Sequence, residues 1–147
     1  MNKAYIHKKI KELFIVQEDD GSYNLFGTYV VTPQPNGGFK VSKDDEVSVE
    51  FSTLKYAVTW CVFEKNNKHK EIERLISLDQ FINNLEVNMH QHKKLAEKIK
   101  GSDRDIYLAK FLEEKLKKRR AIAEIEQYTL FSRYIQTKKF SESKVGN

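Results

Sequence analysis

The chain has 147 residues, of which 39% are hydrophobic, 12% aromatic and 32% charged, so it is long enough for a real core and polar enough for a soluble helix-rich protein. It has no apolar run of 18 or more residues and no charged-then-apolar leader, which indicates neither a membrane span nor a secretory signal. Its one cysteine, Cys61, excludes an internal disulfide and suits a reducing interior, so we expect a cytoplasmic, intracellular protein without a membrane partner.

The net charge of +5 is unevenly distributed along the chain. Up to Ser52 there are six Lys against eight Asp and Glu, a net of −2, whereas the remainder has twenty Lys and Arg against thirteen acids, a net of +7. The basic character therefore belongs to the later part of the chain.

The first element is expected over residues 3–17, where Tyr5, Ile6, Ile10 and Leu13 recur at helical spacing. This pattern predicts an amphipathic helix that ends before a turn at residues 18–21.

Three strands are expected next. Leu25–Thr32 is rich in β-branched and aromatic residues, and Asn36-Gly37 is a tight-turn dipeptide that returns the chain through Phe39–Val41. Val47–Phe51 alternates apolar and polar residues, as a strand with one buried face does. The region predicts a three-stranded antiparallel meander.

A helix over Thr53–Lys65 should cover this sheet, with Ser52 as its N-cap. It is apolar over a wide arc, which predicts that it lies between the sheet and other helices. Cys61 falls on this apolar helix and is expected to be a buried core thiol rather than a nucleophile.

Two long helical arms follow, from about His69 to about Thr137, joined at Gly101. Gly101 fits the left-handed position that ends a helix and Ser102 fits an N-cap, so the arms should form an antiparallel hairpin. The first arm has the three-and-four spacing of a coiled-coil seam. The seam residues are Leu75, Leu78, Ile82, Leu85, Met89, His92, Ala96 and Ile99. The second arm covers more than one stripe, including Phe111, Leu112, Leu116 and Ile125.

Two resemblances attach to these patterns. Thr32-Pro33, Asn36–Phe39 and Phe51–Thr53 resemble the turns of small three-stranded-sheet-plus-helix modules such as the AP2-type DNA-binding domain. AP2-type sheets present Arg and Trp to DNA, whereas residues 23–51 have neither, so the resemblance concerns fold. The stretches Phe51–Cys61 and Ile106–Lys110 also resemble small uncharacterised proteins of marine tailed phages, which implies a phage-encoded protein in the host cytoplasm and no known activity.

Basic residues gather around the Gly101 turn. Between His92 and Arg120 eleven cations face five acids, a net of +6. With Tyr107 they form what we call the basic tip: Lys93, Lys94, Lys98, Lys100, Arg104, Tyr107, Lys110, Lys115, Lys117, Lys118, Arg119 and Arg120. The tip could contact nucleic-acid phosphates or an acidic partner. The alternative is a solvated helix face, because Glu113 and Lys117 form a favourable i,i+4 pair.

No catalytic, cofactor-binding or metal site is predicted. His90 and His92 point about 200° apart on a helix, so they do not chelate one ion, and His92 is better explained as a polar seam residue that sets register.

The sequence therefore predicts an α+β protein without a cofactor. We expect a lobe over residues 1–67, made of a helix, a three-stranded antiparallel meander and a covering helix, then a coiled-coil-like hairpin over 68–140 and a flexible tail over 141–147. The favoured function is a non-enzymatic interaction or assembly protein that contacts a protein partner, or a second copy, through the hairpin. The alternative is a sequence-independent nucleic-acid-binding protein that uses the basic tip.

Overall fold

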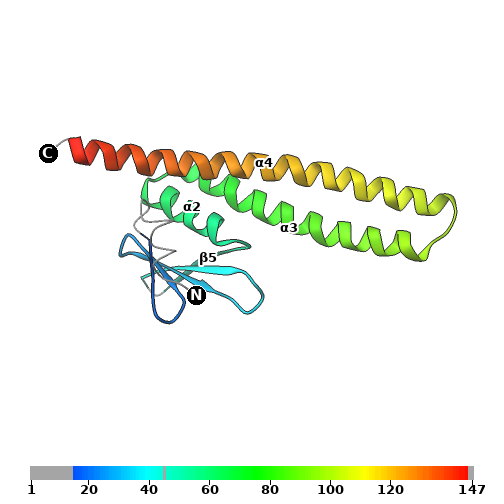
Figure 1. The fold of residues 1–147 in the computed structure, drawn as a ribbon, viewed down its shortest axis with the longest axis horizontal. Helices are drawn as coiled ribbons and strands as arrows, with labels where there is room; N and C mark the ends of the chain where they lie inside the picture. The colour runs from blue at the N-terminus through cyan, green and yellow to red at the C-terminus, as the bar shows by residue number, and fades with distance from the viewer. Residues whose placement is uncertain (1–14, 45, 146–147) are drawn as a thin grey trace. The chain divides into compact units, whose positions relative to one another are not determined.

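The computed structural model describes residues 15–44 and 46–145, which form a five-stranded antiparallel sheet and three α-helices (Figure 1). The elements are β1 (Ile15–Gln17), β2 (Tyr23–Leu25), β3 (Tyr29–Pro33), β4 (Phe39–Lys43), β5 (Glu46–Phe51), α2 (Leu54–Lys65), α3 (His69–Lys98) and α4 (Ser102–Val145). The α+β class and the two long final helices agree with the sequence prediction.

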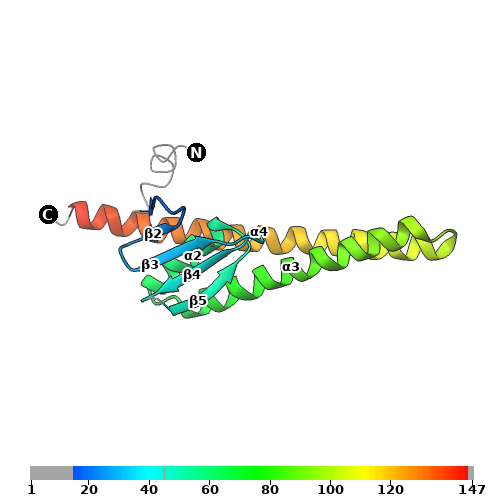
Figure 2. The same ribbon diagram turned by 90° about the horizontal axis from the view of Figure 1, so that it is seen from below.

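The sheet is a meander in the order β1-β2-β3-β4-β5, and Figure 2 labels strands β2 to β5. The predicted three strands are thus too few. The predicted turn at Asn36-Gly37 is confirmed: Gly37 has φ +90°, the amide of Gly38 donates to Asn36 Oδ1 at 2.9 Å, and the amide of Gln34 donates to the carbonyl of Gly38 at 2.7 Å.

The predicted strand Leu25–Thr32 is confirmed over Tyr29–Thr32, which lies in β3, but it is wrong as one continuous strand, because a turn after Leu25 separates β2 from β3. Phe26 and Gly27 have φ of +58° and +73°, the positive values that a type I′ turn needs at both of its central residues. The turn is closed by the amide of Thr28, which donates to the carbonyl of Leu25 at 3.1 Å. The amide of Gly27 donates to Asn24 Oδ1, also at 3.1 Å.

The predicted N-terminal helix is also wrong where it can be compared. Ile15–Gln17 is strand β1, paired with β2 and alternating buried, exposed and buried side chains. The rest of the predicted helix, residues 3–14, lies outside the described residues. The β1–β2 turn is held by Asp20, whose carboxylate accepts from the amide and hydroxyl of Ser22 at 2.9 and 2.6 Å; these bonds lower the pKa of Asp20.

Helix α2 is buried on nearly every side, from Tyr56 to Phe63. On the sheet side the Trp60 ring lies edge-on to the Tyr29 ring, with ring centroids 6.0 Å apart. On the other side the Phe63 ring contacts the rings of Tyr128 and Phe131 of α4, with centroid distances of 6.3 and 6.0 Å. The expected position of this helix between sheet and helix is therefore observed (Figure 1).

The start of α2 corrects one detail and confirms another. Thr53, not Ser52, is the N-cap, because its hydroxyl accepts from the amide of Tyr56 at 3.1 Å. Cys61 is fully buried, as expected of a core thiol, and this burial raises its pKa.

The hairpin turn between α3 and α4 lies at Gly101, which has φ +88°. Helix α4 continues to Val145, past the expected end at Thr137 and through most of the segment expected to be a tail. The chain divides into two compact units: Ile76–Gln127, called here the hairpin unit, and the sheet unit, which combines residues up to Leu75 with those from Tyr128 onward.

Candidate interaction site

The predicted seam residues form the inward face of α3. Leu75, Leu78, Ile82, Leu85 and Ala96 are buried, and Met89, His92 and Ile99 are half-buried. Leu75 belongs to the sheet unit and the other seven to the hairpin unit. The seam is therefore an internal surface of the chain.

The matching face of α4 mixes aromatic, polar and aliphatic residues. Six residues follow an alternating spacing of four and three and are all buried or half-buried: Tyr107, Phe111, Glu114, Lys118, Ala121 and Ile125. This spacing is that of the partner seam in an antiparallel helix pair. Sequence reading missed Glu114 and Lys118 because it selected apolar residues only.

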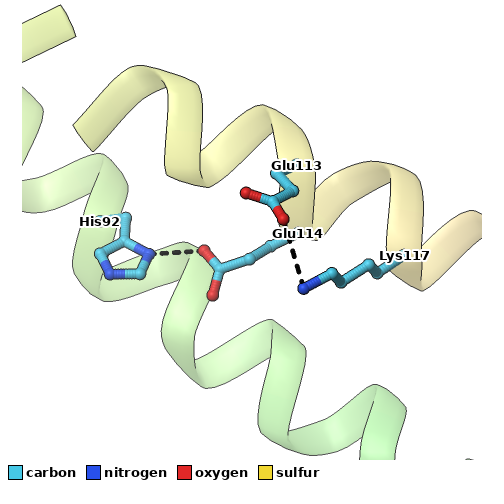
Figure 3. Close-up of polar contacts among 4 residues, drawn as sticks. All are labelled: His92, Glu113, Glu114 and Lys117. Atoms are coloured by element: carbon cyan, nitrogen blue, oxygen red, sulfur yellow. Dashed lines mark hydrogen bonds and ion pairs between the residues drawn. The ribbon is translucent and has the colours of Figure 1, made fainter. Parts of the chain in front are cut away.

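A polar layer crosses the two seams. The imidazole Nδ1 of His92 lies 2.5 Å from Oε1 of Glu114, and since a carboxylate oxygen accepts, Nδ1 is the donor (Figure 3). The ring of Tyr107 on α4 stacks on the His92 ring, with centroids 6.1 Å apart. Lys118 Nζ pairs with Glu86 at 3.2 Å. The expected polar seam position at His92 thus has a specific partner.

Two of the eleven cations in the basic tip make ion pairs. These are Lys118, already described, and Lys117, which pairs with Glu113 at 3.4 Å on the surface of α4 (Figure 3). The other nine are exposed and have no carboxylate within ion-pair distance among the described residues: Lys93, Lys94, Lys98, Lys100, Arg104, Lys110, Lys115, Arg119 and Arg120. Lys110 instead lies 5.5 Å from the centre of the Tyr107 ring.

The basic tip has cations without ion pairs, whereas its aromatic rings are already packed against other residues. Tyr107 is half-buried and stacked on His92, and Phe111 is half-buried in the α4 seam. Neither ring stands free as a platform on which a base could stack. The cations remain available to an anionic partner through charge alone.

The opposite face of α4 is apolar and exposed. Leu112 and Leu116 are 56% and 52% accessible, and each lies two residues from Glu114, about 200° around the helix from the seam. Exposed Ala109 and Ala123 continue the same spacing on either side. We call these four residues the outer strip. The sequence analysis assigned Leu112 and Leu116 to an arm with more than one apolar stripe, and it did not separate the stripe that faces α3 from the one that is exposed.

The sheet unit has an open hollow of about 540 Å³ lined by Val16, Glu18, Asn24, Phe26, Gly27 and Lys65. The ammonium of Lys65 lies 4.1 Å from the centre of the Phe26 ring, on one side of this hollow. It is a wide surface depression whose lining includes two titratable side chains, Glu18 and Lys65.

The parts of the chain that the structure describes contain no group of three or more His, Cys, Asp or Glu placed to hold a metal ion. No helix in the described ranges has the length and apolar character needed to cross a membrane. Comparison of the sequence with protein-family models gives no match, and comparisons with curated proteins and with solved structures give none either.

Proposed function

We propose that this protein is a non-enzymatic interaction or assembly protein whose helical hairpin binds a protein partner. The observation that carries the proposal is the exposure of Leu112 and Leu116 on a helix face that the hairpin does not use internally. Burying a leucine side chain contributes about 1.5–3 kcal/mol, so a surface that leaves two of them exposed side by side gains by association.

The outer strip replaces the α3 seam as the proposed contact surface. Leu85 and its seam neighbours are already buried, so a partner would have to open the hairpin to reach them. A charge at this position, as in Leu85→Asp, is expected to unfold the hairpin rather than to block association selectively.

The proposal is tested by site-specific photo-crosslinking. A photoreactive amino acid at position 112 of the full chain is irradiated in an extract of its native source, and the adducts are identified by mass spectrometry. We expect one or a few discrete protein adducts whose yield falls in a Leu116→Gln background. The same probe at exposed position 91 on α3 is the matched control. Identical adducts from both positions, or none from position 112, would reject the proposal.

A second candidate function is sequence-independent nucleic-acid binding by the basic tip, favoured by its nine exposed cations without ion pairs. Binding of a labelled single strand, followed by fluorescence anisotropy, should weaken steeply with salt. Replacing Lys93, Lys94 and Lys98 by Glu should reduce the magnitude of the slope of log K against log salt by about 2, since each lost phosphate contact removes roughly 0.7. An unchanged slope would exclude these cations as phosphate contacts.

A further inference from the structure

We propose that the outer strip docks an acidic amphipathic helix supplied by a partner protein. This inference rests on the proposed function and specifies the chemistry of the partner. Its basis is the combination of an exposed heptad spacing with uncompensated positive charge on the same face of α4.

The spacing of the strip is that of a helix-packing seam. Ala109, Leu112, Leu116 and Ala123 follow steps of three, four and seven, and Arg119 occupies the intervening position. At 1.5 Å per residue the strip is about 21 Å long, which is two heptads. The small alanines at its ends allow a second helix to approach closely. A single narrow stripe fits another helix, whereas a helix that lies on a membrane surface presents a broad apolar face.

The charges beside the strip select the partner. Lys115 and Arg120 lie on its two edges and Arg119 lies within it, and none of the three has a carboxylate partner among the described residues. Glu113, which follows Leu112 directly in the sequence, is paired with Lys117. A partner helix with Asp or Glu beside its own apolar stripe would supply the missing counter-charges, and like charges would be repelled.

The same charges argue against a second copy of this chain as the occupant. A two-fold interface uses one surface twice, so it must be self-complementary. Pairing two α4 helices antiparallel about the leucines would bring Lys115 against Lys115 of the other copy. Nucleic acid would satisfy the cations but would leave Leu112 and Leu116 exposed.

The test uses two synthetic peptides of about 21 residues with Leu at the two core positions of each heptad. One carries Glu at the flanking positions and the other carries Lys. Each is labelled and titrated with the full-length protein by fluorescence anisotropy at physiological salt, and circular dichroism confirms that every variant is folded. We expect the Glu peptide to bind and the Lys peptide to fail.

Variants then assign the contact. Leu112→Gln with Leu116→Gln should abolish binding of the Glu peptide. Lys115→Glu with Arg119→Glu and Arg120→Glu should weaken it at least 10-fold and allow the Lys peptide to bind. The matched control, Lys94→Glu with Lys98→Glu on α3, should change affinity less than 2-fold.

Five results would overturn the inference. Equal binding of both peptides would exclude selection by charge. An equal loss of affinity for the Glu peptide in the α3 control would show that the attraction comes from the whole basic tip and not from the outer strip. Sedimentation showing a dimer that the leucine variant breaks would assign the strip to a second copy. Failure of the Glu peptide while position 112 still crosslinks one protein would reject the acidic helix but keep the interaction role. Failure of both experiments would reject the two together.

Discussion

The polar layer of the hairpin should contribute a measurable coupling free energy. The perturbation is a double-mutant cycle in which His92→Ala and Glu114→Ala are made singly and together. The two side chains are 23% and 13% exposed, so their contact lies between a surface ion pair, worth about 0–1 kcal/mol, and a buried one, whose disruption costs about 3–5 kcal/mol. We expect a coupling free energy of about 1–3 kcal/mol.

The free energy of local opening is measured by hydrogen exchange at the amides of residues 82–118, because exchange reports each helix segment separately. The control cycle is Glu113→Ala with Lys117→Ala, a pair whose side chains are 68% and 51% exposed. The coupling free energy of this pair should be about 0.3–0.5 kcal/mol and should disappear in high salt. The His92–Glu114 coupling should be less sensitive to salt, since solvent screens it less.

A coupling free energy for His92 and Glu114 no larger than that of the control would refute this reasoning. The joint replacement His92→Leu with Glu114→Leu gives a further check. It should leave the hairpin as stable as the parent or more stable, because apolar packing substitutes for a pair whose desolvation offsets much of its attraction.

Three further predictions concern the sheet unit. Thr53→Ala should lower the free energy of unfolding by about 1 kcal/mol in denaturant titrations, and Thr53→Ser should restore it, because the hydroxyl caps the amide of Tyr56. Burial, with a smaller contribution from Glu64, raises the pKa of Tyr29 from its ordinary value near 10 to about 12. The stability from its neutral phenol is therefore complete below pH 10 and lost as the pH rises through 12, and thermal melts of Tyr29→Phe should show a weaker decline over that range. Burial also raises the pKa of the Cys61 thiol, so a thiol reagent at neutral pH should react with it only at the rate of unfolding; rapid modification of the folded protein would contradict the buried position.

Local rules explain which elements of the fold were predictable. The Asn36-Gly37 turn, helix α2 and the Gly101 break depend on residues adjacent in sequence, so their chemistry is visible without tertiary structure. Strand β1 was not predictable in this way. Its three residues fit a helical period as well as a strand period, and pairing with β2 decides between them.

The Phe26-Gly27 turn shows a different limit. A bulky residue with positive φ contradicts local preference, so the sequence favours an uninterrupted strand there. Contacts from other elements accompany the conformation: Lys65 lies over the Phe26 ring, and Tyr29 meets that ring edge-on at 6.4 Å. Tertiary contacts therefore decide the strand count.

The sequence by itself determined that two long arms form, the turn between them and the inward face of α3, because one dominant apolar stripe leaves a single way to bury that helix. It did not determine the end of α4, which continues past Thr137 to Val145. The sequence could not show which face of α4 packs against α3 and which is exposed. Hydrophobicity alone favours burying Leu112 and Leu116, yet in the structure the two leucines are exposed and Glu114 and Lys118 are half-buried in the α4 seam. The physical reason is that α3 provides a partner for each polar group: His92 for Glu114 and Glu86 for Lys118. A polar group can be removed from water when it has such a partner. Only the packing of the two helices against each other leaves the leucines on the surface.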